Sequence, residues 1–316
     1  MPTPIAGSAL DWGLFMALVL GLLTLDIGLL ARREPSPGIV SAAVWSVLWT
    51  AAALGFNLWA YLRFGRRIGL EFLSAYIVER SLSFDNLFIF LLIFNSFAVP
   101  REQQRRVLLW GILGALLSRG LFIGLGAVLL ARFSLLLLPM GAFLAWTGSR
   151  LVRRGLSDFD SDNNRVLRWT RRVLPVTGEF HGGRFFVRDG GRTLATPLLL
   201  VLVAIETTDI AFAVDSIPAA FGVSRHAFIV FSSNVFAILG LRALYPLVGE
   251  LMRRLRGLGR GLGLMLVLVG LEMMAEPWVD IPAEISLALV TVPLAITIAA
   301  SLRRNEWRLR DAQRDE

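Results

Sequence analysis

Several residue types that carry chemistry in proteins are absent or scarce in this 316-residue chain. It contains no cysteine, which excludes disulfides, thiolate metal ligands and cysteine redox chemistry. It contains no lysine, so all 32 basic residues are arginines. Only two histidines occur, His181 and His226, and both lie outside or at the ends of apolar segments. We interpret them as loop residues, so soft and imidazole metal ligands are essentially missing.

Charge of either sign is also scarce, at 18% of residues, where a soluble domain carries about 25%. Apolar residues make up 55% of the chain, and the mean hydropathy is +0.65. These values favour an integral membrane protein over a soluble enzyme. The net charge of +8 sits on arginines between apolar segments, which is typical of loops on the cytoplasmic side. We therefore expect the lipid bilayer, and not nucleic acid, as the partner; protein partners are not predicted.

The apolar segments are long enough to cross a bilayer as helices of about 20 residues. We predict an all-α polytopic membrane protein with about nine transmembrane helices in a single membrane domain, residues 1–316. The predicted spans are residues 12–30, 39–62, 70–97, 107–130, 133–152, 195–221, 227–247, 258–274 and 281–302.

A polar segment, residues 153–194, divides the spans, and we predict it to be a small cytoplasmic insert. Residues 185–195 contain Asp189-Gly190-Gly191 between two short apolar runs, which predicts a β-hairpin. The arginine distribution favours an N-terminus outside and a C-terminus in the cytoplasm, although the loop with Arg63, Arg66 and Arg67 disagrees.

Seven acidic residues are the most informative ones within the apolar segments. Each charge at mid-membrane costs roughly 2.5–3.5 kcal/mol on insertion scales, so seven ionised acids would cost on the order of 20 kcal/mol. That cost favours a functional site over a purely structural role. The seven are Asp26, Glu79, Asp85, Glu206, Asp209, Asp215 and Glu272.

Two of the acid-bearing segments match each other, and they are offset by three spans. An odd number of spans reverses the direction of the second copy, which predicts two inverted repeats of three helices, residues 70–152 and 195–275. Transporters built in this way bind their substrate near the membrane midplane, between the repeats. The matched positions are Glu79 with Asp209, Asp85 with Asp215, Asn86 with Ser216, and Arg119 with Arg242.

Carboxylates, Asn86, Ser216 and the carbonyls freed by Pro218 are hard oxygen donors. Such a set suits Mn²⁺, Mg²⁺ or Ca²⁺ and suits copper or zinc poorly. The alternative is that the acids pair with Arg119 and Arg242 and stabilise helix packing. Asp26 and Glu272 are uncertain members of a site, because each sits alone on its helix.

Residues 76–88 (YIVERSLSFDNLF) and 206–219 (ETTDIAFAVDSIPA) resemble the signature segments of the TerC/Alx family of integral membrane proteins. The resemblance covers roughly residues 10–300, and the insert with its hairpin is similar to the Alx branch. It implies a polytopic protein of the bacterial inner membrane linked to manganese export, to metal loading of secreted enzymes and to tellurium resistance. Where that family usually has a basic residue, this chain has Glu272.

We therefore expect a secondary transporter that exports Mn²⁺, not an enzyme, with no permanently bound cofactor. Asp85 and Asp215 are the expected primary ligands, with Asn86 and Ser216 as neutral ligands and Arg119 and Arg242 balancing charge. Glu79, Asp209 and Glu206 are the expected further ligands or proton carriers. Two alternatives stay open: a membrane scaffold of a stress-resistance system with structural acids, and tellurium oxyanion handling through the two arginines.

Overall fold

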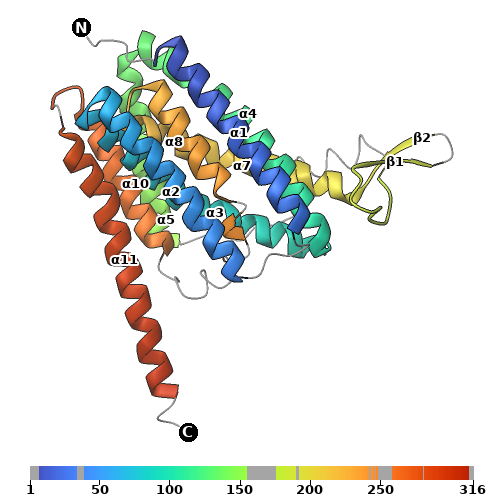
Figure 1. Cartoon of the computed structure of the whole chain (residues 1–316). Coiled ribbons are helices and arrows are strands. Elements are labelled where there is room, and N and C mark those ends of the chain that lie inside the picture. The colour runs from blue at the N-terminus through green and yellow to red at the C-terminus, as the bar shows by residue number, and fades with distance from the viewer. Residues whose placement is uncertain are drawn as a thin grey trace.

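The computed structural model describes residues 7–33, 39–154, 176–189, 192–241, 243–245, 247, 258–279 and 281–312. In this part of the chain the protein is a bundle of long helices with one two-stranded hairpin (Figure 1). The elements are α1 (Ala9–Arg33), α2 (Ile39–Phe64), α3 (Arg66–Ser96), α4 (Arg101–Arg132), η1 (Ser134–Leu136), α5 (Leu137–Arg154), β1 (Phe186–Asp189), β2 (Arg192–Ala195), α7 (Pro197–Val223), α8 (Ala227–Leu239), α10 (Leu258–Ala275) and α11 (Ala283–Ala312).

Each apolar segment of the sequence falls on one of these helices, so the all-α prediction is confirmed. Four helices of the described residues are long and apolar enough to cross a membrane: Val40–Phe64, Arg101–Arg132, Pro197–Val223 and Ala283–Ser301. The segment predicted as one span over 227–247 differs, because α8 ends at Leu239 with Gly240 as its C-cap. Its 13 residues reach only about 20 Å, less than the roughly 30 Å of a bilayer core. Nine spans thus stay a prediction.

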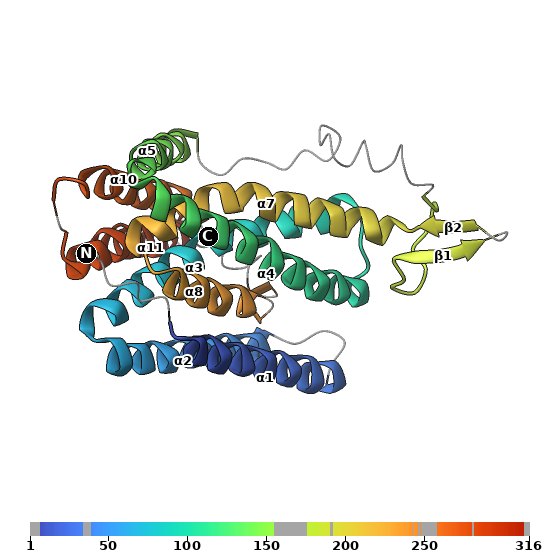
Figure 2. The same cartoon turned by 90° about the horizontal axis from the view of Figure 1, so that it is seen from above.

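Helices α3, α4, α7 and α8 form the centre of the bundle and pack against one another. Seen from above, α1 and α2 cover one side of this centre, and α5 and α10 lie on the opposite side (Figure 2). An aromatic cluster joins α1 and α2 to the centre through Phe15, Phe56, Phe72, Phe228 and Phe236. The most buried polar residues therefore come from the four central helices.

Helices α5 and α10 approach each other through glycines. A Cβ atom on Gly141 would lie 2.6 Å from the carbonyl oxygen of Gly270, and one on Gly148 would lie 2.6 Å from that of Gly263. Conversely, a Cβ atom on Gly263 or Gly270 of α10 would meet the carbonyl oxygen of Gly148 or Gly141 of α5. Small residues let membrane helices pack backbone to backbone, and only glycine fits at these four positions.

The predicted hairpin is present beyond the end of the helices (Figures 1 and 2). Strands β1 and β2 pair antiparallel, with Phe186 opposite Ala195 and Asp189 opposite Arg192. The hairpin contacts the start of α4, where the guanidinium of Arg106 lies 5.6 Å from the ring centre of Phe185. The rest of the predicted insert, residues 155–175, lies outside the described residues.

Candidate functional site

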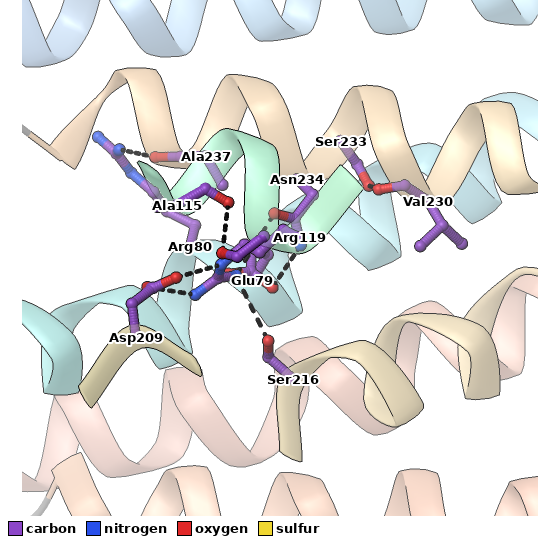
Figure 3. A network of polar contacts seen from close by, with 11 residues as sticks. Glu79, Arg80, Ala115, Arg119, Asp209, Ser216, Val230, Ser233, Asn234 and Ala237 are labelled. Atoms are coloured by element: carbon purple, nitrogen blue, oxygen red, sulfur yellow. Dashed lines mark hydrogen bonds and ion pairs between the residues drawn. The ribbon is translucent and has the colours of Figure 1, made fainter. Parts of the chain in front are cut away.

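A fully buried arginine, Arg119, lies where the four central helices meet, with 1% of its surface exposed (Figure 3). It comes from α4 and contacts acids on two other helices. Its Nε and Nη2 donate to the two carboxylate oxygens of Asp209 on α7, at 3.2 and 3.0 Å. Its Nη1 donates to Oε1 of Glu79 on α3. One guanidinium therefore links acids that lie 40 and 90 residues away in the chain.

Neutral polar side chains complete this network. Asn234 on α8 donates from Nδ2 to Oε2 of Glu79 at 2.9 Å, and its Oδ1 lies 3.4 Å from Nη1 of Arg119. The hydroxyl of Ser216 also lies 3.4 Å from that nitrogen. When its amide oxygen faces Arg119, Asn86 accepts a hydrogen bond from Nη2 at 3.1 Å. All of these residues are almost completely buried.

With both acids ionised, the charges of the network do not cancel. Arg119 stays protonated in proteins and carries one positive charge, against one negative charge each for ionised Glu79 and Asp209. Each of the four carboxylate oxygens accepts a hydrogen bond from Arg119 or Asn234. A metal ion that binds both acids must therefore displace or share the contacts of Arg119. Within the described part of the chain, no three acidic or histidine side chains are grouped so that they hold a metal ion.

The other predicted site residues lie apart from this network or outside the description. Glu206 is half-buried on α7, and its carboxylate lies against Gly114 of α4. Asp215 is half-buried, and no hydrogen bond or ion pair of the described residues joins it to Arg119. The side chains of Asp85 and Asp26, and all of Arg242, lie outside the described residues. Glu272 on α10 belongs to a separate cavity.

Three polar residues that were not singled out from the sequence make contacts on the central helices α3 and α8. Asn234 was not assigned, although it is a polar residue inside an apolar segment. Arg80 was not assigned either; its Nη1 donates to the carbonyl oxygen of Ala237 at 3.2 Å, and its guanidinium lies against Gly240. It thereby binds the carboxyl-terminal end of the short helix α8. Glu71 on α3 is 7% exposed and was not among the seven acids.

Apolar helices around a buried cluster of charges define an integral membrane protein of the α-helical class. Residues 64–308 match the model of the integral membrane protein TerC family, and the chain belongs to that family.

Curated relatives are similar over nearly the whole chain. An uncharacterized membrane protein of Myxococcus xanthus is 41% identical over 299 residues, which cover 95% of this chain and 94% of the relative. A Photorhabdus laumondii protein, Alx, is 39% identical over 97% of this chain and 99% of its own length. Alx of Escherichia coli K12 is 40% identical over 92% and 94%. The names of both Alx proteins suggest a membrane-bound redox modulator. No solved structure matches the chain.

Proposed function

We propose that this protein is a secondary transporter that exports a divalent metal ion, with Mn²⁺ as the favoured substrate, across the bacterial inner membrane. The observation that carries the proposal is the convergence of Glu79 and Asp209 on Arg119. These two acids occupy matched positions in the two similar segments, and both helices bring them to the same buried point. A structural ion pair needs one acid, whereas this network holds two and, with both ionised, carries an excess negative charge.

The excess negative charge favours a cation near the network. Asp215 and Glu206 lie on the same helix as Asp209, and Asp85 lies two helical turns beyond Glu79. These hard donors suit Mn²⁺, and they are the further ligands of the proposed route. Arg119 then acts as an internal cation that neutralises part of the acid charge when the metal has left.

The contacts of α5 and α10 support an arrangement as inverted repeats. These helices are third in the first and last in the second of the proposed repeats. Gly141 of α5 faces Gly270 of α10, and Gly148 faces Gly263, and the two glycines of each helix are seven positions apart. Such reciprocal contacts are expected when a pseudo-two-fold axis passes between two equivalent helices.

The proposed orientation places the hairpin in the cytoplasm. The hairpin contacts Arg106 at the start of α4, so this insert and the arginine-rich start of α4 share one end of the bundle. The positive-inside rule assigns that end to the cytoplasm. The links between α2 and α3, α7 and α8, and α10 and α11 would then face outside.

A membrane scaffold with structural acids is the second candidate, and the ion pairs of Arg119 favour it. Oxyanion handling is less well supported, because the guanidinium of Arg119 is already surrounded by carboxylates. A thiol-based redox function is excluded because the chain has no cysteine.

Flux of Mn²⁺ into proteoliposomes, with and without a pH gradient, separates the two candidates. Asp209→Asn and Asp215→Asn should abolish flux while the protein still inserts, because insertion becomes easier when a charge is lost. Glu284→Gln is the matched control, since Glu284 is half exposed and pairs, among the described residues, with the exposed Arg66. Wild-type protein without flux, or full flux in both aspartate variants, would refute the transporter.

A further inference from the structure

A second polar cavity, with a volume of about 760 Å³, lies at one end of the bundle. It is lined where α2 meets α3, where α7 meets α8 and where α10 meets α11. On α3, Glu71 of this cavity and Glu79 of the Arg119 network are eight residues apart, or about 12 Å along the helix. Its chemically important lining residues are Glu71, Ser224, His226, Glu272, Glu276 and Ser286.

Two of the three acids in this cavity have cationic partners. Glu71 accepts a hydrogen bond from the Ser224 hydroxyl at 2.7 Å and one from Nε of Arg67 at 3.1 Å. Glu276 forms an ion pair with Nε of Arg225 at 2.6 Å. The two arginines therefore balance these two carboxylates, and they leave the third acid, Glu272, as the excess charge of the cavity.

Glu272 is only 7% exposed and has no cationic partner among the described residues. The hydroxyl of Ser286 on α11 donates to its Oε1. Its second oxygen, Oε2, is buried and has no hydrogen-bond partner in the described part of the protein. A buried carboxylate without a counter-charge is costly, so this group is stabilised by a proton or by a cation from the cavity.

The donors select the kind of cation. One carboxylate and one hydroxyl are hard ligands but too few to replace the water shell of a metal ion. Small divalent cations bind in this way, through one or two carboxylates, and keep several waters. Six waters occupy roughly 180 Å³ at about 30 Å³ each, which the cavity accommodates. The ion would be held weakly and would exchange readily.

We propose that Glu272 and Ser286 form a second binding site, for a hydrated divalent cation, at the extracytoplasmic mouth of the protein. Its place in an export route rests on the proposed function, whereas the binding of the cation does not. The site holds the ion after it has left the buried acids and before it enters bulk water.

The experiment uses Mn²⁺ as the probe and the full chain in phosphatidylcholine nanodiscs. Because the chain has no cysteine, Trp278→Cys provides a unique position for a nitroxide label. Trp278 is 74% exposed and lies six residues beyond Glu272, on the order of 10 Å away. Bound Mn²⁺ should broaden the nitroxide spectrum in a saturable manner.

In the labelled protein, Glu272→Gln should raise the Mn²⁺ concentration that gives half-maximal broadening at least tenfold. Ser286→Ala should raise it less. Glu272→Gln keeps the volume of the side chain and removes a buried charge, so the protein should retain its melting temperature. Glu284→Gln removes an exposed acid on the same helix as Ser286 and should change nothing. Asp209→Asn, which alters the Arg119 network, should also leave the broadening intact.

Broadening that is absent in the wild type, or equal in the wild type and Glu272→Gln, would overturn this site. Glu272-dependent broadening without flux in proteoliposomes would refute the proposed export and leave the site standing. Flux without broadening would refute the site alone.

Discussion

Replacing Arg119 by glutamine tests whether the buried network depends on its only described cation. Arg119→Gln leaves Glu79 and Asp209 with two negative charges and no cation between them. It also removes the bidentate contact with Asp209, at 3.2 and 3.0 Å. Removing one partner of a buried ion pair costs about 3–5 kcal/mol. At a few degrees per kcal/mol, the melting temperature should fall by on the order of 10 °C.

A second substitution should restore much of this stability. Arg119→Gln combined with Asp209→Asn returns the net charge of the network from −2 to −1, its value in the wild type. We expect the double variant to recover at least half of the lost melting temperature. Thermal unfolding of the purified protein in detergent, followed by tryptophan fluorescence, measures all variants in one format.

Arg66→Gln is the control for the loss of an arginine. Arg66 pairs with Glu284 at 3.0 Å, and both side chains are at least half exposed, so its loss should cost less than about 1 kcal/mol. Arg119→Gln could melt within about 2 °C of the wild type, as the control is expected to do, or the added Asp209→Asn could give no recovery. Either result would show that the charge argument is wrong.

Three other predictions concern packing, a helix end and orientation. Gly148→Ala should lower the free energy of unfolding by about 1–3 kcal/mol, because its Cβ atom would meet the α10 backbone. Gly124→Ala, where the Cβ atom would point into open space, should be neutral or stabilising, and thermal unfolding compares the two variants. Arg80→Met removes a charged hydrogen bond to the Ala237 carbonyl, so hydrogen exchange should speed up at the end of α8 and leave the start of α8 unchanged. A cysteine introduced by Gly178→Cys, near the hairpin, should react with an impermeant maleimide only from the cytoplasmic side of oriented vesicles; labelling from the other side alone would reverse the topology.

The helices were predictable from the sequence because each apolar segment is nearly as long as a bilayer is thick, and length alone then determines the element. The hairpin was predictable because a Gly-Gly turn separates two short runs. The end of α8 was not predicted, since the apolar run continues past Gly240 and only the contact with Arg80 reveals the break.

The candidate site was predictable only in part. Acids in apolar segments stand out because of their insertion cost, so Glu79 and Asp209 were identified, and Arg119 was identified as a balancing charge. The pairing of each acid with Arg119 depends on contacts between residues that are 40 and 90 positions apart in the chain. The local spacing of residues within one helix does not predict such contacts. Asn234 is a further case, since it is joined to Glu79 across 155 residues.

The glycine contacts of α5 and α10 have a consequence for how the sequence can vary. When two large side chains meet, a larger residue on one helix can be compensated by a smaller residue on the other. Here both helices already carry the smallest residue, and the atom nearest to the Cβ position of each glycine is a backbone carbonyl oxygen of the partner helix. A second-site change of side chain cannot remove that oxygen, so we expect every substitution of Gly141, Gly148, Gly263 or Gly270 to be destabilising, singly or in combination.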